Sequence, residues 1–418
     1  MVEKLTRKAT LSIYLVALGG NIAFAVENQF YNVFLYNEIA PVPLYVSLMV
    51  MITAFVATFT AIVMGAISDV KGNRRSFMVY GFVLWALTTA IFPFAALVRP
   101  VVMAIFTAIL FDCIMSYFGA TAYDAALKAY VIDITTLENR GKATSIVEIM
   151  TLLSTLIIYG ASGFIVLAVG YYAFFILIGI LTGVIGLSGS FLVKDSENLR
   201  PLDVSVWEHL KSTFNINFLK SNKDCFLVLL GIGIWAIGFN VFFPFILIYL
   251  EHWVGLELLL ASLVVFIALM VSILSGVFIG KFIDKFGRKK IAIGSVVLLS
   301  ISLVLYSFTT DIFLLTITGI LWVLFMSTYH ISSQTWVNDL YPKEKAGQFT
   351  GYFLVFNVLI GMLIGPWIGN LIAEQWGRSI IIDGIPGLVP PPLIYSIAAI
   401  IMLFSIIPIL LAKELKKS

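Results

Sequence analysis

Long apolar runs recur along the whole chain and leave few folds open to it. Twelve stretches of about eighteen or more predominantly apolar residues can be marked out, and each could cross a hydrocarbon core of about 30 Å as a helix. Of the 418 residues, 61% are hydrophobic and only 12% are charged, whereas about 25% is usual for a soluble domain. The sequence therefore predicts an all-α membrane protein with twelve transmembrane helices.

One long polar interruption divides these runs into two groups of six. The predicted spans are 11–36, 46–64, 77–98, 101–122 with a further turn or two, 145–167, 171–193, 225–250, 258–280, 291–308, 312–332, 349–372 and 393–411. We expect an N-terminal six-helix bundle at 1–193, a cytoplasmic linker at 194–224 and a C-terminal bundle at 225–418. Within the linker, Trp207, Leu210 and Phe214 recur at helical spacing, which fits either a helix lying in the membrane interface or a solvated helix.

The positions of basic residues give an independent test of this topology. With the N-terminus inside, every Lys and Arg except Arg99 and Arg378 falls on a cytoplasmic segment, as the positive-inside rule requires. We therefore expect a multi-pass protein of the cell membrane with both termini in the cytoplasm. The net charge of +3 follows from topology and does not indicate a nucleic-acid partner.

Features of enzymes are missing from the sequence. It has no phosphate-cradling loop and no nucleophile with a matched base. The two cysteines, Cys113 and Cys225, fall in different spans and suggest neither a disulfide framework nor a metal site. We expect no enzymatic activity, no cofactor and no bound metal, and we expect a monomer.

Two polar phrases are each repeated once per half. GAISDVKGNRR at 65–75 matches GKFIDKFGRKK at 280–290, and YDAALKAYVIDITTLENRG at 123–141 matches YHISSQTWVNDLYPKEKAG at 329–347. Glycines in such loops permit tight turns and close approach of helices, and the acidic and basic residues can pair at the ends of the helices. Recurrence at equivalent places indicates two structurally related halves.

These repeats resemble the signature loops of the major facilitator superfamily, and the resemblance covers essentially the whole chain. It implies two six-helix bundles related by a pseudo-twofold axis, which rock about a central site in alternating access. It also implies a cytoplasmic gate. The residues that match this gate are Gly65, Asp69, Gly72, Arg74, Arg75, Asp133, Glu138 and Arg140 in the first half, and Gly280, Asp284, Gly287, Arg288, Asp339 and Glu344 in the second. Asn73 stands where the family usually has an arginine, so the first gate must rely on Arg74 or Arg75.

Candidate substrate ligands follow from the family's cavity-lining spans, which are one, four, seven and ten. On a helical wheel Asn21, Asn28 and Asn32 share one stripe of span one, flanked by Glu27 and Tyr31. Spans seven and ten add further polar and aromatic groups, namely Trp235, Asn240, His330 and Gln334. Amide, phenol and aromatic groups suit a hydroxyl-rich or zwitterionic solute. The alternative is that the asparagines form hydrogen bonds only between helices.

Four ionisable residues inside the spans are candidates for ion coupling, because charge in a membrane interior is expensive and tends to be functional. They are Asp124, Asp112, Glu27 and His330. Asp124 is the first candidate, but it lies four residues from Lys128, so a salt-bridge network with Lys128 and Glu148 is the competing interpretation. Asp112 lies twelve residues before Asp124, about 120° around an α-helix, and no partner for it is evident.

Together these features predict a secondary active transporter for a small polar organic solute, sugar-like or zwitterionic, working by symport with H⁺ or, alternatively, Na⁺. The likeness within the family is loosely to sugar-cation symporters. One alternative is an exporter of amphipathic compounds, although YGASGFIVLAVG in span five lacks the proline of the exporter pattern. Another is a non-transporting receptor or lipid-handling protein on the same fold.

Overall fold

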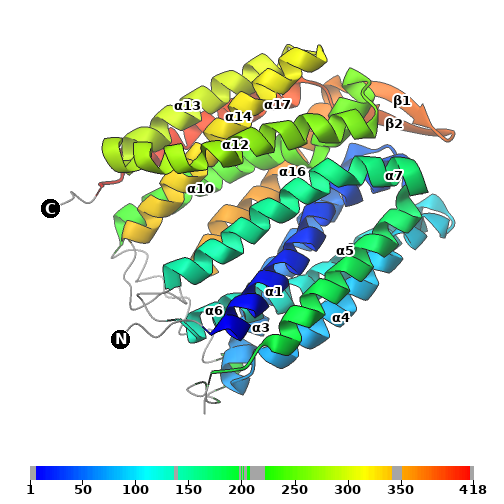
Figure 1. Ribbon diagram of the computed structural model, residues 1–418. Helices are drawn as coiled ribbons and strands as arrows, with labels where there is room; N and C mark the ends of the chain where they lie inside the picture. The colour runs from blue at the N-terminus through cyan, green and yellow to red at the C-terminus, as the bar shows by residue number, and fades with distance from the viewer. Residues whose placement is uncertain are drawn as a thin grey trace. The chain divides into compact units, whose positions relative to one another are not determined.

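The computed structural model describes residues 6–135, 140–196, 199, 201, 205–207, 222–340 and 351–414, with the side chains of 140–142, 277–278, 280–281 and 284 excepted. Almost all of these residues are helical (Figure 1). The chain divides into two compact units. Unit 1 comprises Met1–Ala40 and Ile52–Ser212, and unit 2 comprises Pro41–Met51 and Thr213–Ser418.

Unit 1 is built from long helices joined by short turns. They are α1 (Arg7–Val26), α2 (Asn32–Phe34), most of α3 (Pro43–Lys71), α4 (Arg75–Ile91), α5 (Val101–Gly119), α6 (Lys128–Asp133) and α7 (Arg140–Leu192). Short π-helical segments, Glu27–Tyr31, Leu35–Ile39 and Ala120–Leu127, continue α1, α2 and α5 without a break. A 3₁₀ turn, Phe92–Leu97, ends the third span.

Unit 2 repeats this plan. Its helices are α10 (Lys223–Phe242), α11 (Ile246–Ile248), α12 (Leu258–Phe286), α13 (Arg288–Ser307), α14 (Ile312–Leu340), α16 (Ile360–Trp376), α17 (Leu393–Phe404) and α18 (Ile406–Leu411). A 3₁₀ turn at Phe243–Phe245 and π-helical segments at Tyr249–Val254 and Val355–Leu359 interrupt them. Between α16 and α17 the antiparallel strands β1 (Arg378–Ile382) and β2 (Ile385–Val389) form a hairpin.

The number of membrane crossings agrees with the sequence prediction. Eleven candidate spans can be counted among the described residues, one of them Ala143–Leu192 with 50 residues. Fifty helical residues would extend about 75 Å, more than twice the hydrocarbon thickness. This helix changes direction at Gly170, where φ is 77°, so it supplies two spans and the total is twelve.

Several helices extend beyond the spans read from hydropathy. The helix α14 continues to Leu340, eight residues past the predicted end, and α3 reaches Lys71. Hydropathy locates only the segment inside hydrocarbon, whereas helical hydrogen bonds continue into the polar region beyond it. Two acidic residues of the repeated motifs, Asp69 and Asp339, therefore lie in the last turns of long helices.

Small residues let the helices of unit 1 approach closely. A Cβ added at Gly19 would lie 2.8 Å from the backbone nitrogen of Gly186, and one at Gly179 would lie 2.6 Å from the carbonyl oxygen of Ala86. The first contact joins α1 to α7 and the second joins α4 to α7. Packing through small residues is the usual way in which helices associate inside a membrane.

A comparable glycine stripe in unit 2 joins α16 to α10. Added Cβ atoms at Gly361 and Gly365 would lie 2.8 Å from the Cβ of Ala236 and 2.6 Å from the Cβ of Asn240. The Gly and Pro pattern around Pro366 thus has a packing role. A 3.0 Å hydrogen bond from the Leu388 amide to the carbonyl of Pro41, two residues before α3, holds the β-hairpin to this segment.

Candidate functional site

Two buried carboxyl groups meet in the interior of unit 1. Glu27 lies directly after α1, and Asp112, 2% exposed, lies in the middle of α5. The two carboxyls are within hydrogen-bonding reach of each other, and the Thr53 hydroxyl of α3 reaches Asp112. Ser116, one turn after Asp112, donates a 2.5 Å hydrogen bond to Glu27 Oε1. Spans one, two and four therefore converge on this carboxyl pair.

Hydrogen bonding within the carboxyl pair is incomplete. Glu27 Oε2 and Asp112 Oδ1 are both buried and have no donor among the described residues. Buried polar atoms are nearly always satisfied, so each exception calls for an explanation. Two neighbouring carboxylates also cannot both stay charged in a low-dielectric interior. A single proton on either carboxyl would supply the missing donor and remove the repulsion.

A π-helical turn positions Glu27. It covers Glu27–Tyr31, so the backbone hydrogen bonds there skip one more residue than in an α-helix. Such turns are rare and occur frequently at functional sites. The turn also rotates the following residues relative to a regular helical wheel, which matters for the asparagine stripe predicted on this span.

The structure separates the members of that stripe. Asn21 is buried and its Nδ2 donates to the Tyr123 hydroxyl at 2.7 Å. Asn28 is exposed and donates to the Phe24 carbonyl at 2.8 Å. Asn32 is 1% exposed and donates to the Asn28 carbonyl at 2.9 Å, while its Oδ1 has no partner among the described residues. Asn28 and the Oδ1 atom of Asn32 can thus still form hydrogen bonds with a ligand.

Tyr31 occupies a packing position. It has no exposed surface, and its ring stacks on Phe92 at a centroid distance of 3.6 Å and meets Phe175 edge-on at 5.3 Å. The wheel placed Tyr31 on the flank of the polar stripe, but the π-helical turn directs it into the aromatic core of unit 1. Its hydroxyl oxygen is buried and has no hydrogen-bond partner among the described residues, and its role as a solute ligand stays a prediction.

Asp124 has a direct basic partner. Its Oδ1 lies 2.7 Å from Nζ of Lys128, and the two side chains are 20% and 39% exposed. Glu148 on α7 adds a second negative charge near Lys128. This is the salt-bridge network that the sequence analysis gave as the competing interpretation. The geometry favours it over a free coupling carboxylate at Asp124, although the coupling role stays untested.

Aromatic rings form a continuous face on α10 in unit 2. Trp235 and Phe239 are stacked at 5.4 Å with an interplanar angle of 9°, and Phe239 and Phe243 are stacked at 4.4 Å. Tyr329 and His330 of α14 lie 5.2 Å and 6.2 Å from the Trp235 ring. The partly exposed edge of this aromatic face is formed by Phe239, Phe243 and His330.

Polar atoms accompany this aromatic face. Nε1 of Trp235 is buried and has no hydrogen-bond acceptor among the described residues. Asn240, 7% exposed, donates to the Ala236 carbonyl at 2.9 Å, which leaves its carbonyl oxygen for another partner. Gln334, one turn beyond His330 on α14, is partly exposed. Rings with a few unpaired donors and acceptors are typical of a small-molecule site.

Arg74 forms the centre of the charged motif in unit 1. Its guanidinium group contacts Asp69 at 2.6 Å, Asp133 at 2.8 Å and the Ser68 hydroxyl at 2.8 Å, with only 4% of the side chain exposed. Burial opposes the charge, but the hydrogen bond and charge of Asp133, followed by those of Asp69, outweigh it and raise the pKa of Arg74. The sequence left open whether Arg74 or Arg75 takes the place of the arginine that the family usually has at position 73. Arg74 is the one that pairs with Asp69 and Asp133.

Unit 2 carries the same kind of arginine–aspartate contact. Nε of Arg288 lies 2.7 Å from Asp339 Oδ2, and the Ser332 hydroxyl donates to the Arg288 carbonyl at 2.7 Å. Gly287 and its counterpart Gly72 have φ values of 89° and 59°, as tight turns require. By contrast, a Cβ at Gly65 would meet nothing within 4 Å, so the close helix approach expected there is absent among the described residues.

Sequence reasoning missed one acidic residue in each half. Asp195 accepts hydrogen bonds from the backbone amides of Arg74 and Arg75 at 2.9 and 3.2 Å. Glu414 accepts one from the Arg288 amide at 2.6 Å. Each carboxylate caps a helix N-terminus, where negative charge is stabilising. The sequence did contain a signal for these two acids. Each directly follows a lysine just after the last span of its half, so the two occupy equivalent positions.

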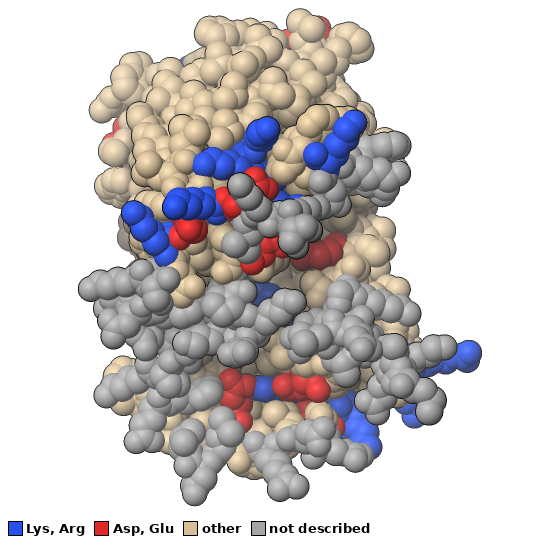
Figure 2. Space-filling model, turned by 90° about the vertical axis from the view of Figure 1, so that its left-hand side faces the viewer, with Lys and Arg blue, Asp and Glu red and all other residues tan. Residues whose placement is uncertain are grey.

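Figure 2 shows Lys and Arg side chains beside those of Asp and Glu. Several predicted gate residues lie outside the described part of the chain. They are Glu138 and Glu344, together with the side chains of Arg140 and Asp284. The backbone of Gly280 lies in α12. The predicted linker helix at Leu210 and Phe214 also lies outside it. The role of all these residues as a cytoplasmic gate stays a prediction.

Comparison with known proteins decides the family. The sequence profile of the Major Facilitator Superfamily matches residues 13–259 and again 228–418, and the two matches together cover nearly the whole chain. The chain belongs to the major facilitator superfamily. It is a multi-pass membrane transporter and not an enzyme, as predicted. A search of curated protein sequences found no match.

Solved structures of this superfamily show the same fold. A nucleoside transporter, NupG, aligns with a TM-score of 0.69 and 14% identity, covering 98% of this chain and 100% of the other. The inward-open xylose transporter XylE from E. coli aligns with a TM-score of 0.71 and 16% identity, covering 97% of each chain. A D-xylose-proton symporter aligns at 0.68 and 15%, covering 95% and 96%. At these identities the likeness establishes the fold alone.

Proposed function

We propose that this superfamily member is a proton-coupled symporter that takes up a small polar organic solute. The observation that carries the proposal is the carboxyl pair of Glu27 and Asp112. A buried pair that needs one proton can bind it from one side of the membrane and release it to the other when its surroundings change. Proton relays in transporters are commonly built from acids inside the membrane.

The solute we propose carries hydroxyl or amide groups and one flat or apolar ring face. In unit 2 the aromatic face of Trp235, Phe239 and Phe243 offers stacking, and Nε1 of Trp235 has no hydrogen-bond acceptor among the described residues. The structural neighbours named for nucleosides and D-xylose support this class of solute. No observation favours the amphipathic exporter or the non-transporting receptor.

Co-transport of protons can be measured directly with the purified chain in proteoliposomes that contain a pH-sensitive dye. Adding uridine or D-xylose outside should acidify the lumen, because each solute molecule enters with a proton. The same solute should raise the melting temperature of the protein, since a ligand that binds only the folded state stabilises it. Stabilisation without acidification would contradict proton coupling, and the absence of both for a wider panel of nucleosides and sugars would contradict the solute class.

We further propose that the protein lies in the cell membrane with its termini inside and the β-hairpin outside. Ser379 is exposed on β1 beside Arg378, which is one of the two basic residues outside the predicted cytoplasmic segments. A Ser379→Cys variant with Cys113 and Cys225 replaced by Ala should react with an impermeant maleimide in intact cells. Reaction only after lysis would reverse the orientation, and a cysteine at Thr6 should show the opposite pattern.

A further inference from the structure

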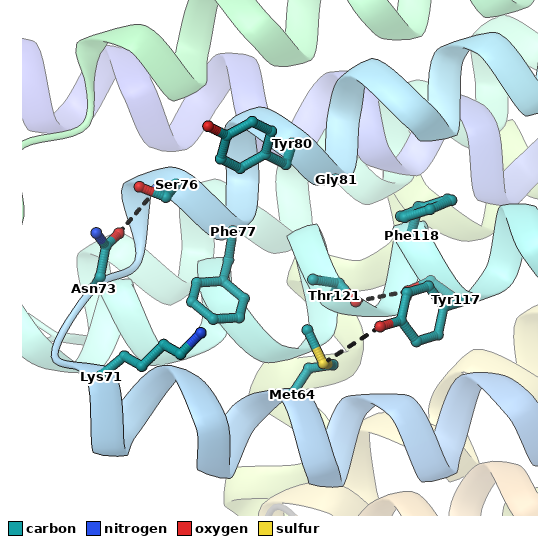
Figure 3. A pocket seen from close by; sticks show the side chains of 10 residues that line it. All are labelled: Met64, Lys71, Asn73, Ser76, Phe77, Tyr80, Gly81, Tyr117, Phe118 and Thr121. Carbon is teal, nitrogen blue, oxygen red and sulfur yellow. Dashed lines mark hydrogen bonds between the residues drawn. The ribbon is translucent and has the colours of Figure 1, made fainter.

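A groove on the surface of unit 1 lies outside the features discussed so far. It has a volume of about 550 Å³ and is lined by side chains of α3, α4 and α5 with its π-helical continuation. Figure 3 shows its two ends. Lys71, Asn73 and Ser76 lie at one end, and Met64 and Tyr117 lie at the other, where the Tyr117 hydroxyl contacts Met64 Sδ at 3.7 Å.

The groove changes from polar to apolar along its length. Met64 precedes Lys71 by seven residues on one helix, which corresponds to about 10 Å along the axis. Lys71 ends α3 and Ser76 lies in the first turn of α4, so the polar end coincides with the ends of two spanning helices. The apolar end therefore lies about 10 Å deeper in the membrane.

The walls of the groove are open to its surroundings. Tyr80 is 71% exposed and Tyr117 is 40% exposed, although both belong to spanning helices. An aromatic wall in this position faces hydrocarbon rather than water. A hydroxyl at the tip of an apolar ring is typical of tyrosines at the boundary between lipid tails and headgroups.

Lys71 is the one charged side chain among the residues that line the groove. The ammonium group of Lys71 lies 5.9 Å from the centre of the Phe77 ring, and Figure 3 shows these two side chains pointing toward one another. The neighbouring Arg75 is exposed. Among the residues that line the groove, none is acidic. The polar end thus suits a group that carries negative charge and accepts hydrogen bonds.

We propose that this groove binds an anionic phospholipid of the adjacent leaflet. Its phosphate lies at Lys71 with hydroxyl and amide donors from Ser76 and Asn73, and one acyl chain lies along Phe77 toward Met64 and Tyr117. The proposal follows from the charge and the polar-to-apolar gradient of the groove. It does not depend on which solute the protein carries.

Native mass spectrometry of the full-length chain can test the proposal with an equimolar mixture of phosphatidylglycerol and phosphatidylcholine of identical acyl chains. The wild type should retain phosphatidylglycerol about fivefold more than phosphatidylcholine, since one lysine near a membrane surface contributes about that factor. Lys71→Gln should bring the ratio to about one, and Lys71→Glu should bring it below one. Tyr80→Ala should lower retention of both lipids because it removes a wall.

The matched control is Lys8→Gln, which removes an exposed lysine near the start of α1 in the same unit. It should leave the lipid ratio unchanged. Equal retention of both lipids by the wild type would overturn the proposal, as would a Lys8→Gln effect as large as that of Lys71→Gln. Displacement of the lipid by millimolar inorganic phosphate would indicate a phosphate site instead and would also overturn it.

Discussion

Replacing Asp112 by Asn should abolish uphill accumulation of solute while leaving exchange of solute intact. With one proton per solute, a gradient of one pH unit can sustain about a tenfold accumulation, because 1.4 kcal/mol corresponds to a factor of ten. The amide of Asn supplies a permanent donor toward Glu27, so the pair no longer needs a proton. The accumulation ratio in proteoliposomes should therefore fall from about ten to about one, and Glu27→Gln should have the same effect.

Exchange of labelled for unlabelled solute needs no net movement of protons, so both variants should retain it. Their melting temperatures should not fall, since the amide donates the hydrogen bond that the shared proton otherwise supplies and leaves the pair with the same single negative charge. This combination of lost accumulation, retained exchange and unchanged stability distinguishes a coupling site from a structural one.

Asp124→Asn is the matched control, because it neutralises another acid of the same span. It should keep accumulation and lose about 1 kcal/mol of stability or less, since the ion pair with Lys128 is partly exposed. Adding Lys128→Gln to the Asp124→Asn variant should restore the lost stability. If Asp124→Asn abolishes accumulation while Asp112→Asn and Glu27→Gln leave it at tenfold, the proton is carried by Asp124 and the assignment to the carboxyl pair is wrong.

Arg74→Gln should destabilise unit 1 by about 2–4 kcal/mol. The substitution leaves Asp69 and Asp133 facing each other without a cation, and breaking a buried ion pair costs about 3–5 kcal/mol. The expected loss is smaller because the Asp69 side chain is 35% exposed and solvent screens it. The melting temperature measured by thermal denaturation in detergent should fall by about 5–10 °C.

Arg75→Gln provides the comparison, because it removes the same charge from the next residue. Its side chain is exposed, and its contact with Asp195 is made by the backbone amide, which the substitution keeps. A change within about 0.5 kcal/mol is expected. Equal losses in the two variants would show that overall charge, and not the buried contacts of Arg74, stabilises this end of the unit.

The stabilisation by Arg74 should hardly vary with alkaline pH. Because its pKa is raised in the folded state, the contribution is fully present below the pKa of the unfolded chain and is lost only as the pH rises through the folded value. Both values lie above the range in which most proteins remain folded.

Much of the architecture followed from the sequence alone. The sequence predicted twelve spans, two related halves and the family. This was possible because a bilayer forces each crossing to be a long apolar helix and concentrates Lys and Arg on one side. The gate motifs were readable for a related reason. Gly72, Asp69 and Arg74 are close in the chain, so spacing alone indicates their contacts, and the second copy in unit 2 removes most of the chance of a coincidental match.

Contacts within the membrane depended on the tertiary structure. The sequence named Glu27 and Asp112 separately and gave Asp112 no partner, since 85 residues of chain separate them and rotation about each helix cannot be read from composition. The helical wheel assumed 3.6 residues per turn, and the π-helical turn at Glu27–Tyr31 breaks that assumption where it matters most. It carries Tyr31 into the aromatic core and leaves Asn28 exposed. The candidate carboxyls could be named from the sequence, but only the packing of spans one, two and four decided which two of them share one buried space.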